Sequence, residues 1–262
     1  MNLEELDNKT LYCSHCNATM SDNDKFCGHC GMPLVPEKVG KERRVVYLIV
    51  AFYAFFLLHT IVSFFIYEEE ITLTRELWVE GIFILSTIIF CLMDWKRILA
   101  LFTAQGVPLW AWGISILFPI VTGFSVYYGM DVINSFLEVE DNNVFWEYFT
   151  YENPVLWAMI FYVLIPPIFE ELAFRGFLFN QLRLLLNPTV TIIATAVLFA
   201  LVHFSFVSML WIFPFGMALG YLRFRFKTLW LGMIIHFIHN LIVVSLDYYY
   251  FDSTFFYEDL IF

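Results

Sequence analysis

The chain alternates between long apolar runs and short polar segments. Apolar residues dominate seven stretches, at 45–67, 77–93, 107–128, 155–186, 188–206, 209–224 and 229–247. A helix of about 20 mostly apolar residues can cross the hydrocarbon core of a bilayer. The pattern therefore predicts an all-α fold, a polytopic transmembrane helical bundle of about seven spans. Because the fourth stretch exceeds one crossing, we expect its end, 176–186, to project from the bilayer or to bend along its surface.

The composition agrees with a membrane protein that carries a small polar module. Of the 262 residues, 60% are hydrophobic and only 15% are charged, against about 25% charged in soluble domains. Residues 1–36 are polar and hold four of the five cysteines. We predict a cysteine module at 1–36, a basic linker at 37–44 and a membrane domain at 45–262.

Lys and Arg residues predict how the bundle is oriented. Twelve of the fourteen lie in the N-terminal region or in the segments at 94–97, 183 and 223–227, which the seven-span topology places on one side. Membrane proteins keep short loops rich in Lys and Arg in the cytoplasm. We therefore expect a multi-pass protein of the cell membrane with a cytoplasmic N-terminus.

The N-terminal cysteines have the spacing of a metal site. Two Cys-x2-Cys pairs, Cys13 with Cys16 and Cys27 with Cys30, stand ten residues apart. Four thiolates at this spacing can surround a tetrahedral Zn²⁺. The pattern predicts a zinc ribbon with a structural Zn²⁺, and on a reducing cytoplasmic face disulfides are the weaker alternative. Because so small a module buries little core, the metal would supply most of its folding free energy.

The charge of this ribbon limits its partners. Residues 1–35 carry five Asp or Glu residues and two Lys residues. Nucleic-acid binding needs a basic surface, so we expect no nucleic-acid partner. Docking of a cytoplasmic protein partner is the default interpretation of the module.

Charged residues inside the fourth apolar stretch are the first candidates for chemistry. A carboxylate at the centre of a membrane helix costs about 2.5 kcal/mol or more, so it persists where it is paired or functional. Glu171 and Arg175 are four residues apart and share one helix face. Glu170 points about 100° away and has no local partner. Glu171 is thus predicted to be structural and Glu170 available; the alternative is a structural ion pair beside a buried, protonated glutamate.

Two prolines precede these charges and predict an irregular helix. Pro166 and Pro167 have no N–H group, so the carbonyls of Tyr162 and Val163 lose their helical hydrogen-bond donors. We expect a kink one turn before the charged residues.

A histidine in the next apolar stretch is predicted at the same depth as Glu170. If the chain reverses at Asn187-Pro188, Glu170 and His203 both lie roughly 25 Å from the turn, at 1.5 Å of rise per residue. They would then face each other across an antiparallel helical hairpin. A lone histidine on an apolar face is otherwise more often a satisfied core residue than a catalyst.

The last apolar stretch adds His236, His239 and Asn240. His236 and Asn240 share a helix face, and His239 lies only partly on it. A carboxylate beside an imidazole can activate water, and a histidine with an asparagine can stabilise a developing oxyanion. The spans with these motifs contain a single aspartate, Asp247 at the end of the last one, which disfavours an aspartyl intramembrane protease.

The three motifs in this order resemble the CPBP family, which contains CAAX proteases and bacteriocin-processing enzymes and is also called the Abi family. The motifs are Glu170-Glu171-x3-Arg175, Phe199-x3-His203 and His236-x3-Asn240, and the resemblance covers roughly 150–245. It implies a multi-spanning intramembrane endopeptidase that cleaves membrane-embedded or lipid-modified proteins and peptides. It also implies a water-activating pair of Glu170 and His203, an oxyanion-type pair of His236 and Asn240, and supporting roles for Glu171 and Arg175.

Two questions stay open at this stage. Glu170, His203 and His236 could bind an active-site Zn²⁺, but a glutamate and a histidine can activate water without metal, which we favour. The other question is whether the protein is an enzyme: a non-catalytic membrane scaffold or bacteriocin-immunity protein would use the same polar residues to hold helices together. A transporter is disfavoured, because the paired interrupted helices expected at a midplane site are missing from the pattern.

Overall fold

The computed structural model describes residues 11–13, 15–20, 26–32, 37–67, 72–138 and 143–251. The remaining parts of the predicted ribbon segment and of the C-terminal end lie outside the described residues. The chain divides into two compact units, 1–48 and 49–262. Each unit is described by itself.

The first unit contains a short antiparallel hairpin. Strand β1 (Leu11–Tyr12) pairs with strand β2 (Thr19–Met20), with Leu11 opposite Met20. Helix α1 (Glu37–Tyr67) begins eight residues before the apolar stretch, so the basic segment at 37–44, predicted as a linker, is helical.

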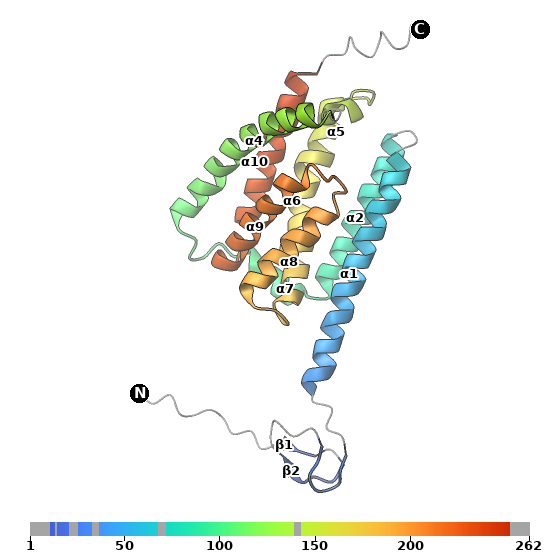
Figure 1. Ribbon diagram of the computed structural model, residues 1–262, viewed down its shortest axis with the longest axis vertical. Helices are drawn as coiled ribbons and strands as arrows, with labels where there is room; N and C mark the ends of the chain where they lie inside the picture. The colour runs from blue at the N-terminus through green and yellow to red at the C-terminus, as the bar shows by residue number, and fades with distance from the viewer. Residues whose placement is uncertain are drawn as a thin grey trace. The chain divides into compact units, whose positions relative to one another are not determined.

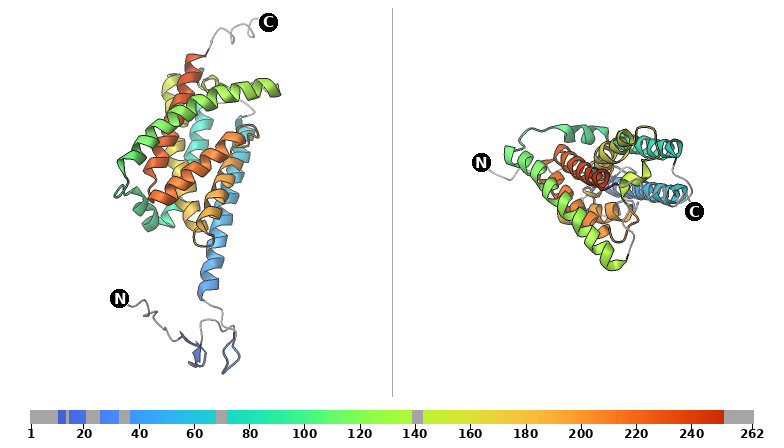
Figure 2. Two further views of the ribbon diagram at one scale, coloured as in Figure 1. Left: turned by 60° about the vertical axis from the view of Figure 1, so that its left-hand side comes forward. Right: turned by 90° about the horizontal axis from the view of Figure 1, so that it is seen from above.

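The second unit is a helical bundle (Figures 1 and 2), which confirms the predicted fold class. Its elements after α1 are α2 (Leu73–Leu92), α3 (Trp95–Leu99), η1 (Ala100–Phe102), α4 (Leu109–Leu137), η2 (Val144–Glu147), α5 (Pro154–Ala158), η3 (Met159–Leu164), α6 (Ile165–Glu170), η4 (Glu171–Leu178), α7 (Phe179–Leu182), α8 (Pro188–Leu201), α9 (Met209–Phe226) and α10 (Trp230–Tyr249). Elements α5 to α7 form one long helix in the centre. Helices α1 and α2 lie at one side of it, and α4 packs along α10 at the other.

The predicted count of seven spans is too high. Among the described residues, four helices are long and apolar enough to cross a membrane, or five if the bent pair of α2 and 95–102, with its 101° angle, is one span. Helix α8 has only 14 residues, about 21 Å against a hydrocarbon core of about 30 Å. Helix α9 carries Arg223 and Arg225 in its last turn, which lowers its apolar character.

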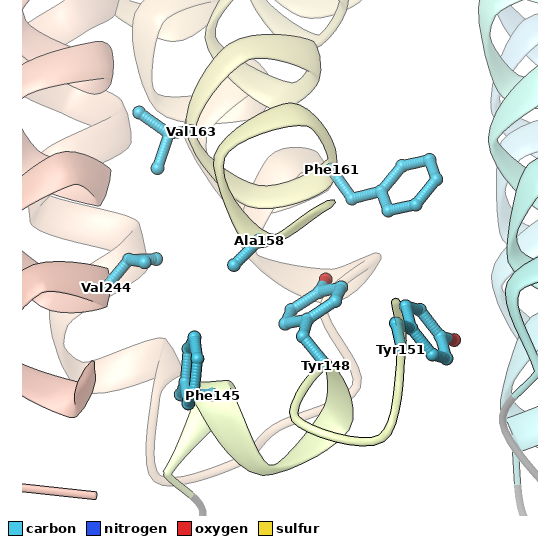
Figure 3. Close-up of a cluster of buried hydrophobic side chains, with 7 residues drawn as sticks. All are labelled: Phe145, Tyr148, Tyr151, Ala158, Phe161, Val163 and Val244. Carbon is cyan, nitrogen blue, oxygen red and sulfur yellow. The ribbon is translucent and has the colours of Figure 1, made fainter. Parts of the chain in front are cut away.

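An aromatic cluster holds the start of the central helix. Phe145, Tyr148 and Tyr151 come from the segment before α5 and pack under the first turns of this helix, as Figure 3 shows. The cluster is completed by buried Ala158, Phe161, Val163 and Val244. Three buried aromatic rings, each removing a large apolar area from water, anchor this end of the helix.

A polar network holds the opposite end of the same helix. Asn180 of α7 donates its side-chain amide to Asp94, at 3.0 Å, and accepts a hydrogen bond from Arg223 of α9, at 2.9 Å. Arg223 also donates through Nε to the carbonyl of Arg175, at 3.1 Å. Because all three side chains are buried, the network fixes how α2, α7 and α9 meet.

Candidate active site

The central helix runs past its two prolines without breaking. Its turn before the prolines, η3, is a π-helix, in which the Ile165 N–H bonds to the carbonyl of Ile160. The carbonyl of Tyr162 would take its helical donor from Pro166 in an α-helix or from Pro167 in a π-helix, and neither has an N–H. Asn240 supplies the missing donor: its Nδ2 lies 2.8 Å from the Tyr162 oxygen. The prolines thus produce a π-helical turn and a cross-link to α10.

Glu171 and Arg175 form a completely buried ion pair. Arg175 Nη1 lies 2.9 Å from Glu171 Oε1, and the two side chains are 0% and 1% exposed. The guanidinium also lies over the ring of Phe199, 4.0 Å from its centroid, and its Nη2 donates to the carbonyl of Gly216, at 3.4 Å. A buried charge is tolerated when it is paired and bonded in this way, so the pair joins η4 to α8 and α9.

Helix α10 approaches Glu171 closely at a glycine. A Cβ atom on Gly232 would lie 2.7 Å from Glu171 Oε2, a distance that side chains do not tolerate. With any other residue at this position, the Glu171 carboxylate or α10 would have to shift.

His236 of α10 lies between the two glutamates. Its Nε2 is 3.8 Å from Glu170 Oε2, and its Nδ1 is 3.6 Å from Glu171 Oε1. Both distances exceed those of hydrogen bonds, and Glu170 Oε2 and His236 Nδ1 have no hydrogen-bond partner among the described residues. Glu170 is 20% exposed, so it is the more accessible of the two carboxylates.

His203 lies just beyond a helix, although the sequence predicted a helix through 206. Helix α8 ends at Leu201, and the Ser205 hydroxyl accepts a hydrogen bond from the N–H of Ser208, which starts the next helix. His203 Nδ1 lies 2.8 Å from the carbonyl of Phe199. Since a carbonyl can only accept, Nδ1 carries the proton and Nε2 keeps a lone pair for a substrate or water.

One cavity collects four of the six predicted site residues. Its volume is about 440 Å³, and Glu170, His203, His236 and Asn240 all line it. Glu171 and Arg175 are not in its wall and lie behind Glu170 and His236. The structure thus brings a carboxylate, two imidazoles and an amide from three chain segments to one cavity, with the buried ion pair as support.

The same cavity wall contains polar residues that were not part of the predicted site. His239, which is buried, packs its ring against those of Trp211 and Phe215, at centroid distances of 5.6 and 5.0 Å. Its Nδ1 has no hydrogen-bond partner among the described residues. Asp247 also lines the cavity. The spacing from His236 to His239 was the available signal, since residues three apart lie on neighbouring faces.

The four ribbon cysteines are gathered as a metal site requires. Their sulfur atoms all lie within 4.8 Å of one another, and two pairs, Cys13 with Cys30 and Cys16 with Cys27, are 3.8 and 3.5 Å apart. Zn–S bonds of about 2.3 Å in a tetrahedron put sulfur atoms about 3.8 Å apart, so a zinc ion fits. Backbone N–H groups of Cys30 and His29 lower the pKa of the Cys27 thiol to about 6, which favours the metal-binding thiolate.

The two cysteine pairs adopt the same backbone turn. The residue after each pair, Asn17 or Gly31, has a positive φ of 54° or 68°. Its N–H bonds to the carbonyl of the first cysteine of its pair, Cys13 or Cys27, at 2.8 Å in both cases. Asparagine and glycine are the residues that adopt this conformation most easily, so each knuckle is encoded locally.

Among the described residues, no second group of metal-ligating side chains is this compact. The four cysteines are the one set of three or more His, Cys, Asp or Glu residues with ligand atoms that close together. Glu170, His203 and His236 share a cavity but are not gathered as a ligand set.

Comparisons with known proteins give one family match in the membrane domain and one in the N-terminal module. Residues 152–242 match the family model described as type II CAAX prenyl endopeptidase, Rce1-like, and residues 12–34 match the zinc-ribbon domain. No curated protein and no solved structure matches the chain. The matches confirm the family resemblance and the ribbon predicted from the motifs. The chain is therefore similar to Rce1-like endopeptidases over 152–242 and to zinc ribbons over 12–34.

Proposed function

We propose that the protein is an intramembrane endopeptidase that hydrolyses peptide bonds of membrane-associated or lipid-modified proteins and peptides. The observation that supports it most strongly is the single cavity shared by Glu170, His203, His236 and Asn240. Intramembrane ionisable groups that line a cavity are functional by default, because their burial is costly. A purely structural role, as in a scaffold or immunity protein, is not favoured beside the match to an endopeptidase family.

Glu170 activates the water molecule. Its carboxylate, assisted by the free Nε2 of His203, takes one proton while the water oxygen adds to the carbonyl carbon of the substrate. The carbon–nitrogen bond then breaks, and the proton passes from Glu170 to the leaving amine. The first products are a carboxylic acid and an amine; the remaining proton of the water then passes from the acid to the amine, which leaves a carboxylate and an ammonium group.

His236 and Asn240 stabilise the oxyanion of the tetrahedral intermediate. Asn240 uses one of its two amide N–H groups for the carbonyl of Tyr162, which leaves the other for the substrate. The ion pair of Glu171 and Arg175 holds His236 in position from behind. Donors that are fixed before the reaction cost no reorganisation during it.

The proposal also covers the use of metal, the location of the protein and its partners. We propose that the cavity chemistry works without an active-site metal, since a glutamate and a histidine can activate water by themselves. We place the protein in the cell membrane with the ribbon in the cytoplasm, where its Zn²⁺ is structural and its surface recruits a protein partner. Substrates reach the cavity from the bilayer or its surface.

The assignment is tested by comparing membrane peptides from cells that carry wild-type protein, Glu170→Gln or His203→Ala. We expect both variants to insert at wild-type levels and to lose the cleavage products, since each removes one member of the water-activating pair. Glu152→Gln, in an exposed loop, serves as the matched control and retains them. Normal product levels in Glu170→Gln would refute the assignment.

A further inference from the structure

A second cavity lies on the other side of Glu170 and His203. Its volume is about 190 Å³, and Pro166, Glu170 and His203 belong to its wall as well as to that of the 440 Å³ cavity. The rest of its wall comes from α1, α2, η4 and the end of α8, through Phe56, His59, Thr60, Ser63, Tyr67, Val79, Glu80, Phe83, Phe174 and Val202. The proposed reacting groups therefore stand between two separate spaces.

The size of the second cavity limits what it can hold. Pockets for drug-sized ligands measure about 300–1,000 Å³, so 190 Å³ suits a single side chain rather than a peptide segment. A peptide bond held at Glu170 would place one part of the substrate in each cavity. The smaller cavity is then next to the bond that is cut.

Glu80 is the polar residue that distinguishes this cavity. It lies two turns into the apolar helix α2, and the structure records no hydrogen bond or ion pair for it among the described residues. The neighbouring acidic residues are Glu170, in the same wall, and Glu76, one turn earlier on α2. A carboxylate in such a position is costly unless it has a function.

The wall has the chemistry of a site for a cationic side chain. It carries two acidic side chains, Glu80 and Glu170, and two histidines, His59 and His203, and contains no Lys or Arg. Phe56, Phe83 and Phe174 provide aromatic surface around them. Lys and Arg side chains pack a long apolar stem against such a surface and keep a charged head for a carboxylate.

We propose that the 190 Å³ cavity binds the side chain of one residue flanking the scissile bond, and that Glu80 selects lysine or arginine at that position. The proposal rests on the proposed function. It assigns Glu80 a role in specificity, away from the hydrolytic step. Thr60 and Ser63 of α1 complete the wall beside it.

The test uses full-length protein in detergent and a library of peptides with one apolar segment, varied at the residues on either side of the cut. We expect the wild type to prefer lysine over methionine, which has a similar length and no charge, at one of these positions. Glu80→Gln should lower the lysine-to-methionine ratio of kcat/KM about tenfold to hundredfold, the range supported by one charge-assisted hydrogen bond. Cleavage of the methionine peptides should be unchanged.

Glu76→Gln is the matched control. It is the same substitution one turn earlier on α2, and Glu76 faces the hydroxyls of Tyr148 and Tyr151 outside the cavity wall. We expect it to leave the ratio unaltered. Ser63→Phe, which fills the cavity, should abolish cleavage next to long residues and spare cleavage next to alanine.

The outcomes separate the two proposals. Cleavage that depends on Glu170 but shows the same residue preference in wild type and Glu80→Gln overturns the specificity role alone. A uniform loss with Ser63→Phe for all peptides does the same. Absence of any Glu170-dependent cleavage overturns the proposed function and the subsite with it.

Discussion

Replacing Gly232 with alanine tests whether the position of Glu171 controls the site. The new Cβ would lie 2.7 Å from Glu171 Oε2, whereas ordinary contacts begin at 3.4 Å. The carboxylate or α10 must therefore move by about 0.7 Å. The other oxygen of the same carboxylate contacts Arg175 at 2.9 Å and His236 at 3.6 Å, so the movement reaches His236 directly.

The expected effect on activity exceeds the effect on stability. Overpacking of this kind costs about 1–3 kcal/mol, and alanine recovers about 1 kcal/mol of helix propensity over glycine. The net loss of stability is thus small, about 0–2 kcal/mol by these figures. A misplacement near 1 Å in a catalytic group costs about a hundredfold in rate, so we expect kcat to fall at least tenfold.

The measurement pairs thermal unfolding in detergent with peptide cleavage by the same preparations. Gly129→Ala is the control, because this α4 glycine has no atom within 4 Å of its Cβ position. It should retain activity and gain slightly in melting temperature. The reasoning is refuted if Gly232→Ala behaves like Gly129→Ala in both assays.

Two further predictions concern the helix cross-link and the metal. Asn240→Leu keeps the side-chain size but leaves the carbonyl of Tyr162 without a donor, so thermal unfolding should show a loss of about 1–3 kcal/mol; an unchanged melting curve would contradict it. Cys27→Ser should remove the bound zinc, measured by elemental analysis, while Cys91→Ser retains it. Proteolysis that persists in zinc-free Cys27→Ser would support a metal-free active site, and residual zinc bound near Glu170 would oppose it.

Local sequence rules predicted the parts of the site that depend on neighbouring residues. Four-residue spacing gave the ion pair of Glu171 and Arg175, and the missing proline N–H groups gave the free carbonyl of Tyr162. The irregularity expected before the charged residues is a π-helical turn. Such features follow from helix geometry alone, which is why one sequence suffices for them.

Features that depend on other helices were missed. The end of α8 at Leu201 is followed by a turn in which the Ser208 N–H bonds to the Ser205 hydroxyl, and two serines are a weak signal inside a continuous apolar run. The seven-span count was wrong for the same reason, because apolar length was taken as helix length. Glu80 was not predicted as a site residue. Its cavity forms only where α1 and α2 pack against the central helix, which the sequence around Glu80 does not reveal.

A structural role and a catalytic role for the buried polar residues do not exclude each other in this structure. Asn240 satisfies a carbonyl that Pro166 and Pro167 leave free, and this bond fixes α10 against the central helix. His236, one turn earlier on α10, is thereby held at 3.8 Å from Glu170. The strongest argument for a structural role, a buried hydrogen bond between helices, is therefore also what sets the distance between two of the proposed reacting groups.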